Sequence, residues 1–354
     1  MKKLWLVLAL GLAGCKSNSI AKEKVDSSYQ PSRMTGQLIT GSGSNMYILE
    51  GDLNYYDADY NKTSLGSLEY ADDKKVDVSQ TISFKKYIDS VCGPIRFYDN
   101  HLYFLSERQT IEGNISYYLN SVDKRGEERE ELLEIPYTPE GTLLIQNGNI
   151  YIGEADSNLT HIYDSSLKEV RTLDGSLLLV TNNHLYLYNS EKGCTQQMDM
   201  KEDSVVNLGD GTLVCATEDA YVMFQMEHPE EGTMTYCSTV YDSKTTQPLY
   251  TFEQEIVGAI DQKHIYATQL QEGRTSYQVY DRDGSPLQEI VPSASVQGEY
   301  HAEVLGEEMD FDQIICAVND HIVTGTLQEV DGMKEYVYAA CSIEDGTCKL
   351  LTEK

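Results

Sequence analysis

Residues 141–174 read GTLLIQNGNIYIGEADSNLTHIYDSSLKEVRTLD, and this stretch decides the fold. It holds four short apolar runs rich in Leu, Ile, Val and Tyr, separated by clusters of Asn, Asp, Gly and Ser. Short apolar runs with turn residues between them are typical of consecutive antiparallel β-strands. The stretch therefore predicts one complete four-stranded sheet.

Copies of this unit recur along the chain. In each copy an apolar run is followed by two or three polar turn residues and then by an apolar residue, usually with Tyr beside it. The pattern gives seven anchor positions, namely Tyr47, Tyr103, Tyr151, Tyr186, Val222, Tyr266 and Val323. Their mean spacing is about 46 residues, the repeat length of a four-stranded propeller blade.

A second element follows the anchor in most copies. It is a strand that ends in Asp, and the Asp opens a turn because its side chain can bond the backbone two residues further on. The clearest of these residues are Asp57, Asp123, Asp164, Asp242 and Asp281. A last apolar strand closes the copy, so each copy supplies four strands.

The repeats predict an all-β fold, a seven-bladed β-propeller of four-stranded antiparallel blades. The blade limits are 36–70, 92–136, 141–174, 175–208, 210–255, 256–292 and 312–352. Segments 71–91 and 293–311 fit no blade; they are excursions or help to close the ring, and residues 25–35 could also pair there. A ring of six or eight blades and a pair of β-sandwiches are the alternatives. One short helical candidate, Glu127 to Leu133, reads better as a turn running into a strand.

Composition agrees with such a ring and excludes some functions. The chain has 354 residues, of which 40% are hydrophobic and 24% charged, as in ordinary globular proteins. Blades that stack face to face need no single growing core, and the 26 Tyr can pack between blades with their hydroxyls at the rim. A net charge of −30 argues against nucleic acid, because phosphate binding needs a basic face.

The N-terminus carries a secretory pattern. Met1-Lys2-Lys3 is a basic start, and the apolar run from Leu4 to Leu12 is too short to span a bilayer. It ends in Leu-Ala-Gly-Cys15, which resembles the bacterial lipobox, where the peptide is cut before a Cys that carries a diacylglyceryl group. We expect a signal peptide at 1–14, lipidated Cys15 with a flexible tether at 15–35, and a single propeller domain at 36–354.

Together the lipobox and the Tyr-rich repeats resemble the bacterial β-propeller lipoproteins, which hang from the cell envelope and mostly bind rather than catalyse. The resemblance implies an extracytoplasmic protein, on the outer membrane of a Gram-negative host or the outward face of the plasma membrane of a Gram-positive one. The only Trp is Trp5, in the signal peptide. The mature chain therefore lacks the Trp signatures of WD40, YWTD and quinoprotein propellers.

The histidines favour a structural role. His101, His184, His264 and His321 share one place in the repeat, the turn before the anchor, so they lie on different blades and cannot converge on one metal unless they line the channel. No HExxH motif is present. We expect no metal site among them.

Two acidic stretches are further candidates. Asp57 to Asn61 has the first spacings of a calcium loop, but Lys62 replaces the required Gly, so we expect a solvated turn. The second stretch lies in an excursion and gathers carboxylates with a non-repeat His, which makes it a candidate cation or basic-partner site. Its residues are His301, Glu303, Glu307, Glu308, Asp310 and Asp312.

Seven cysteines remain once Cys15 is acylated, an odd number, so not all can pair within the chain. Cys341 and Cys348 flank the turn of the last predicted blade and are a candidate disulfide. Cys215 and Cys316 occupy equivalent places in the first strand of their copies, where small buried thiols are expected.

These observations predict a lipid-anchored, extracytoplasmic propeller that acts as a non-catalytic binding or scaffold module for a protein, peptide or glycan. We expect a monomer without a cofactor. The alternative is a propeller enzyme of the lyase, lactonase or glycosidase type, in which His161, His301, Glu303 and Asp310 would converge at the channel mouth. No GxSxG, P-loop or GxGxxG motif supports an enzyme.

Overall fold

The computed structural model describes residues 39–42, 45–76, 82–209, 211–227, 235–271, 274–290, 313–318, 320–330 and 333–351. All the regular structure in these ranges is β-strand, arranged in seven sheets. In the same ranges no helix of the length and apolarity needed to cross a membrane occurs.

The seven sheets follow one another along the chain, and each is built from consecutive strands. The first blade has β1 (Ile39–Ser42), β2 (Asn45–Glu50), β3 (Asp52–Tyr56) and β4 (Lys62–Ser67). The second has β5 (Tyr70–Val76), β6 (Ile82–Tyr98), β7 (His101–Thr110), β8 (Ile115–Asp123) and β9 (Glu130–Ile135). The third has β10 (Pro139–Gln146), β11 (Asn149–Glu154), β12 (Leu159–Tyr163) and β13 (Glu169–Asp174).

The remaining four blades have four strands each. The fourth has β14 (Ser176–Val180), β15 (His184–Asn189), β16 (Cys194–Asp199) and β17 (Val205–Asn207). The fifth has β18 (Thr212–Ala216), β19 (Ala220–Glu227), β20 (Thr235–Asp242) and β21 (Pro248–Glu253). The sixth has β22 (Glu255–Ile260), β23 (His264–Gln271), β24 (Arg274–Asp281) and β25 (Pro286–Ile290). The seventh has β26 (Gln313–Val318), β27 (His321–Val330), β28 (Met333–Ser342) and β29 (Cys348–Leu350).

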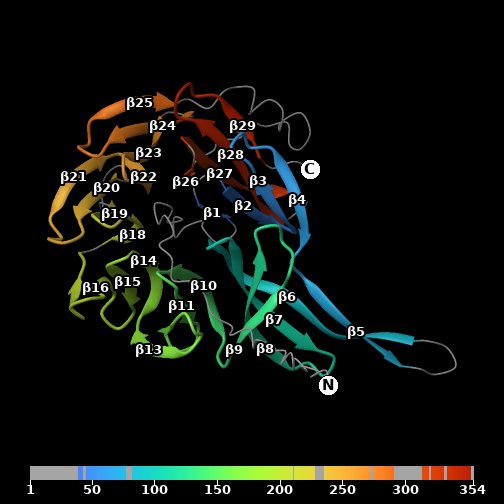
Figure 1. The fold of residues 1–354 in the computed structure, drawn as a ribbon. Helices are drawn as coiled ribbons and strands as arrows, with labels where there is room; N and C mark the ends of the chain where they lie inside the picture. The colour runs from blue at the N-terminus through green and yellow to red at the C-terminus, as the bar shows by residue number, and fades with distance from the viewer. Residues whose placement is uncertain are drawn as a thin grey trace, which may run out of the picture.

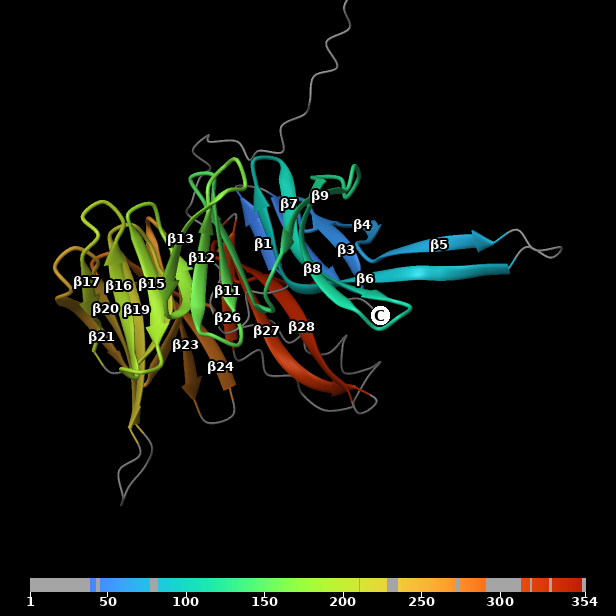
Figure 2. The same cartoon turned by 90° about the horizontal axis from the view of Figure 1, so that it is seen from below.

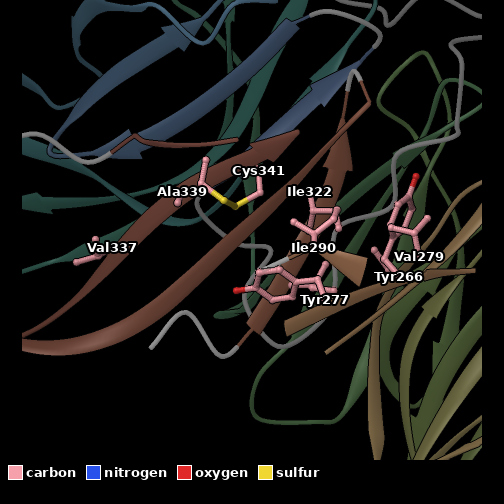
Figure 3. Packing of buried hydrophobic residues seen from close by; sticks show 11 residues of the cluster. Tyr266, Tyr277, Val279, Ile290, Ile322, Val337, Ala339 and Cys341 are labelled. Atoms are coloured by element: carbon pink, nitrogen blue, oxygen red, sulfur yellow. A yellow bond between two sulfur atoms is a disulfide. The ribbon is translucent and has the colours of Figure 1, made fainter. Parts of the chain in front are cut away.

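The sheets form a ring, so the predicted seven-bladed propeller is confirmed (Figure 1). The innermost strands (Figure 1) are β1, β6, β10, β14, β18, β22 and β26, and each contacts the next one in this order. Each of seven buried apolar clusters joins two adjacent blades, including the last and the first. Figure 3 shows the layer between the sixth and seventh blades, where Tyr266 and Tyr277 lie near Ile322. The hydrophobic core is therefore a set of seven layers between blades.

A β-bulge recurs in the innermost strands. The register shifts at Leu178, Val214, Gly258 and Ile315, which are equivalent positions in four consecutive blades. A bulge adds one residue and increases local twist, which lets the inner strand curve around the axis. At Gly258 the neighbouring blade comes so close that a Cβ would lie 2.7 Å from the Cβ of Ile314. That position requires glycine.

Segment 71–91 is an excursion from the ring (Figure 2), which confirms one of the two expectations for it. β5 pairs with the first half of β6, from Tyr70 opposite Asp89 to Val76 opposite Ile82. The same part of β6 also pairs with the end of β7. The segment is thus a hairpin arm of the second blade that projects from the side of the ring (Figure 2), and it is neither an eighth blade nor a ring-closing strand. Segments 25–35 and 293–311 lie outside the described residues.

The first and last blades meet without sharing a strand among the described residues. The hydroxyl of Tyr56 donates to the carbonyl oxygen of Leu351 at 2.9 Å. The ammonium of Lys349 donates to the carbonyl oxygen of Asp59 and to Oδ1 of Asn61, at 3.2 and 3.3 Å. Side chains close the ring where other folds would use a strand.

Candidate binding face

Two sets of turns lie on one face of the ring. The inner turns join the first and second strands of the blades, and the outer turns join the third and fourth. In the second blade the count starts at β6. In four blades a backbone N–H of the outer turn donates to a carbonyl of the inner turn, as Lys124 does to Asn100 at 3.0 Å and Met200 to Asn183 at 2.8 Å. We call the surface formed by both sets the turn face.

Every outer turn opens with a side chain that accepts two backbone N–H groups. Asp57 Oδ1, for example, accepts from Asp59 at 2.9 Å and from Asn61 at 2.8 Å. The seven capping residues are Asp57, Asp123, Asp164, Asp199, Asp242, Asp281 and Ser342. These bonds hold the short turns in one conformation. The backbone N–H of Asn61 is also the main cause that lowers the pKa of Asp57.

The caps of the fourth and seventh blades were not predicted. Asp199 follows Met198, where four other blades place Tyr before the Asp, and the last blade uses the hydroxyl of Ser342. The polar run Lys-Glu-Asp at 201–203, two residues after Asp199, is the signal that could have identified the first of them. The rule of one side-chain cap per blade has no exception in this ring.

The repeat-position histidines stand opposite the caps. In strand register His101 faces Asp123, His184 faces Asp199 and His264 faces Asp281. Each pair belongs to a different blade, so the imidazoles do not form one cluster. The same register places His321 opposite Ser342, completing the series.

Two of these imidazoles differ in their partners. His264 Nδ1 lies 3.2 Å from the hydroxyl of Tyr266, which donates to Oδ2 of Asp261 at 2.7 Å. His184 is 6% exposed, and its Nδ1 has no hydrogen-bond partner. Burial lowers the pKa of His184, although the nearby carboxylates of Asp199 and Glu218 oppose this. His184 is therefore a neutral, buried ring that packs in the core.

Three anchor tyrosines connect their blade to the outer turn of the next one. The hydroxyl of Tyr47 donates to the carbonyl oxygen of Lys124 at 3.1 Å, and that of Tyr151 donates to Sδ of Met200 at 3.5 Å. The hydroxyl of Tyr186 lies 3.5 Å from Oγ of Ser243. In all three cases the partner directly follows a cap. The predicted role of tyrosine, a ring between blades with its hydroxyl at the rim, is found here.

Further polar side chains join the turns of neighbouring blades from the third to the sixth. Asn182 accepts from Gln146 through its side chain and donates its backbone N–H to Glu218 at 2.8 Å. In the next pair of blades Arg282 forms an ion pair with Asp219 at 2.9 Å. These contacts tie neighbouring turns together, so the turn face is rigid across this half of the ring.

Exposed carboxylates outnumber exposed basic side chains on the turn face. The side chain of Asp219 is 71% exposed, and those of Glu127 and Asp203 are 65% and 60% exposed, although each pairs with an arginine. Further exposed carboxylates are those of Glu202, Asp283 and Glu344. The exposed basic side chains of the turns include Lys124, Lys168, Lys201, Lys244 and Lys263.

Hydrogen bonds hold the Asp57 turn. Lys349 directs its ammonium to Asp59 and Asn61, where a calcium loop would need a cation, and Asp57 is occupied by backbone N–H groups. Across the described ranges no three His, Cys, Asp or Glu side chains are grouped as metal ligands.

His161 is the non-repeat histidine within the described residues. Its Nε2 lies 2.9 Å from Glu154 and its Nδ1 lies 3.0 Å from Glu169, while the ring stacks on Tyr137 at 4.0 Å between centroids. The pKa of Glu154 is lowered mainly by a hydrogen bond from Ser157, and then by His161. The pKa of Glu169 is lowered mainly by Thr172, and then by His161.

This triad is a structural hydrogen-bonded cluster. Both ring nitrogens of His161 lie within hydrogen-bond distance of a carboxylate, and the ring stacks on Tyr137. With both nitrogens already held by protein groups, His161 is not arranged as a general base toward a substrate. His301, Glu303 and Asp310, the other residues of the enzyme alternative, lie outside the described residues, as do Cys15, Glu307, Glu308 and Asp312.

The four cysteines singled out in the sequence all lie in the described residues. Cys341 and Cys348 face each other in β28 and β29 and form a disulfide, shown in Figure 3. Cys215 is a buried free thiol, and burial raises its pKa to about 12. Cys316 is buried at the equivalent place in β26, opposite Val323.

No protein-family model matches this sequence, and no curated protein matches it either. Among solved structures, the β-propeller domain of the trilobed protease from Pyrococcus furiosus, described as having an open velcro topology, is 11% identical, with a TM-score of 0.46 over 75% of this chain and 98% of that one. The dihydro-heme d1 dehydrogenase NirN is 9% identical, with a TM-score of 0.45 over 87% and 72% of the two chains. The WD40 domain of Toxoplasma gondii coronin is 10% identical, with a TM-score of 0.43 over 94% and 90%. At these values none of them bears on the function of this chain.

Proposed function

We propose that this propeller is a lipid-anchored, extracytoplasmic binding or scaffold module that holds a protein, peptide or glycan on its turn face. The observation that carries the proposal is the side-chain cap in every outer turn, from Asp57 in the first blade to Ser342 in the last. A surface whose turns are fixed before binding loses little conformational entropy when a partner docks. Loops held on a rigid scaffold are also where binding residues concentrate.

The use of the chemically versatile side chains supports binding rather than catalysis. Capping aspartates are occupied by backbone N–H groups, His184 is buried, and His161 is held between two carboxylates. None of these side chains is placed as an acid, base or nucleophile toward an open site. The described residues therefore favour recognition at the surface.

Charge indicates the kind of partner. Exposed acidic side chains such as those of Glu202 and Asp283 outnumber the exposed basic ones on the turn face, and the whole chain carries a net charge of −30. Such a field attracts basic patches and speeds their association, and salt screens it. A protein or peptide with a basic patch is the partner that fits best.

The anchor follows from the N-terminal sequence. Two acyl chains on Cys15 would hold the protein at a membrane at about 0.8 kcal/mol per buried methylene group. Labelling of growing cells with radioactive palmitate should mark the wild-type chain and leave a Cys15→Ala variant unmarked. Equal labelling of both chains would contradict lipidation at this residue.

Charge reversal tests the binding face. The triple variant Glu202→Lys, Asp283→Lys, Glu344→Lys changes exposed outer-turn residues that neither cap nor pair. Its control, Glu112→Lys, Asp156→Lys, Glu191→Lys, makes the same charge change in exposed turns on the opposite face. We expect the first variant to lose the partner captured by the wild-type protein from solubilised envelope, and the control to retain it. Equal capture by both variants would contradict the proposal.

A further inference from the structure

The outer strand of the last blade is unusually short. β29 (Cys348–Leu350) has three residues and pairs with β28 at three positions, the first of which is Cys348 opposite Cys341. The disulfide joins these two residues. It therefore lies at the start of the strand it attaches.

Contacts that close the ring come from this same short segment. Lys349 donates to Asp59 and Asn61 of the first blade, and the carbonyl oxygen of Leu351 accepts the hydroxyl of Tyr56. The Leu351 side chain is 2% exposed and packs in the apolar cluster shared by the first and last blades. If β29 separated from β28, the contacts of Lys349 and Leu351 with the first blade would go with it, and closure would depend on Ile315, Val323 and Tyr338 of the other strands.

The fourth blade provides a comparison. Its outer strand β17 (Val205–Asn207) also has three residues and pairs with β16 without a disulfide. The chain continues from that blade directly into the fifth, so the polypeptide itself holds the two blades together. Between the seventh and first blades no described residues provide such a connection.

We propose that the Cys341–Cys348 disulfide is the redox-dependent lock of the ring, which stays closed because the bond holds β29 against the first blade. Reduction by a dithiol converts the bond to two cysteine thiols, while the dithiol is oxidised to its own disulfide. Loss of the bond releases the short strand, and the contacts of Lys349 and Leu351 with the first blade weaken. The effect of reduction therefore reaches the first blade and is not confined to the hairpin of β28 and β29.

Burial determines when the lock opens. Cys341 is 1% exposed and Cys348 is 7% exposed, so a reductant has little access to the sulfurs while β29 is in place. Thiol–disulfide exchange requires the attacking thiolate to reach a sulfur atom. Reduction therefore follows the opening of β29, and the closed ring shields the Cys341–Cys348 disulfide from reductants.

Hydrogen–deuterium exchange of the full chain tests the proposal. Folded wild-type protein treated with dithiothreitol and the double variant Cys341→Ser, Cys348→Ser should both exchange faster in β3 and the 57–61 turn, by about tenfold or more, because a disulfide constrains opening. Exchange in the fourth blade, residues 176–207, should stay unchanged. A variant with Cys194→Ser and Cys237→Ser, both free thiols, should behave as wild type.

The dithiothreitol treatment and the double variant control for each other. Treatment of the folded wild-type protein needs no variant to fold, and dithiothreitol should have no effect on the double variant. A rise in exchange confined to residues 342–351, with the first blade as protected as before, would overturn the proposal and leave the disulfide as a local hairpin link. Faster exchange in the first blade would support it.

Discussion

The hydroxyl of Tyr56 donates to the carbonyl oxygen of Leu351 at 2.9 Å, although 295 residues separate them in the sequence. Both groups are buried where the first and last blades meet. This hydrogen bond joins the last and first blades in the way that Tyr47 joins the first and second, where its hydroxyl donates to the carbonyl oxygen of Lys124. Closure of the ring thus extends the ordinary contact between blades.

Replacing Tyr56 by Phe should lower the free energy of unfolding by about 1 to 3 kcal/mol, because the buried carbonyl of Leu351 loses its donor. Urea denaturation followed by circular dichroism would measure the change. Tyr188→Phe is the matched control, since Tyr188 is 36% exposed. Equal stability of the Tyr56 variant and wild type would show that this bond does not contribute to closure.

The caps make a second prediction. Asp281 Oδ1 accepts the N–H groups of Asp283 and Ser285, each at 2.9 Å, and Asp281→Ala should cost about 1 kcal/mol of stability. Asp283→Ala removes an exposed carboxylate from the same turn and should cost less than about 0.5 kcal/mol. Chemical denaturation of both variants would check this. A larger loss in the Asp283 variant would be incompatible with the capping role.

Glu255 makes a third prediction. The carboxylate is buried between the fifth and sixth blades with the hydroxyl of Tyr280 at 2.8 and 2.7 Å from its two oxygens. Burial raises the pKa of Glu255 above its ordinary value of 4.5. The folded state therefore holds this proton more tightly than the unfolded state, and stability is lost as pH rises from the ordinary pKa through the raised one.

A Glu255→Gln variant keeps an acceptor for Tyr280 without the charge. We expect its stability relative to wild type to increase as pH rises from about 5 to about 8, measured by urea denaturation across that range. A stability difference that stays constant with pH would show that Glu255 titrates as it does in the unfolded chain.

The His161 triad has the opposite dependence. The pKa values of Glu154 and Glu169 are lowered from 4.5, so their contribution is present above that pH and is lost as pH falls through the lowered values. His161→Gln should be less stable than wild type at neutral pH, and the difference should shrink below about pH 4.5. His101→Gln, which changes an exposed ring, is the control. A difference that persists in acid would locate the effect in the stacking on Tyr137.

Much of the fold could be predicted because a repeat carries its own geometry. Runs such as Leu143–Ile145 and turns opened by residues such as Asp281 mark strands and strand ends. The predicted blade limits lie within a few residues of the sheets observed, except that the second sheet begins at Tyr70 and not at residue 92. The spacing of the anchors indicated both the number of blades and the place of tyrosine between them. Such local signals can be read from the sequence without knowing the long-range contacts.

The rest depends on contacts that no local pattern shows. The bond between Tyr56 and Leu351 joins opposite ends of the chain, and the two carboxylates at His161 come from different strands. The pairing of β5 with β6 was not predicted, because β6 continues a blade strand outward. The first half of β6 has the composition of a strand but no counterpart in the repeat. Candidate sites at 301–312 and at Cys15 remain predictions, since they lie outside the described residues.

The most direct test of the binding role is photo-crosslinking in intact cells, with a benzophenone amino acid placed at one residue at a time. Asp283 and Glu344 report on the turn face, and Asp156 and Glu191 report on the opposite face. We predict that both turn-face positions give the same adduct and that the other two give none. Adducts formed only from Asp156 and Glu191, or none from Asp283 and Glu344, would contradict the assignment of the turn face as the binding surface.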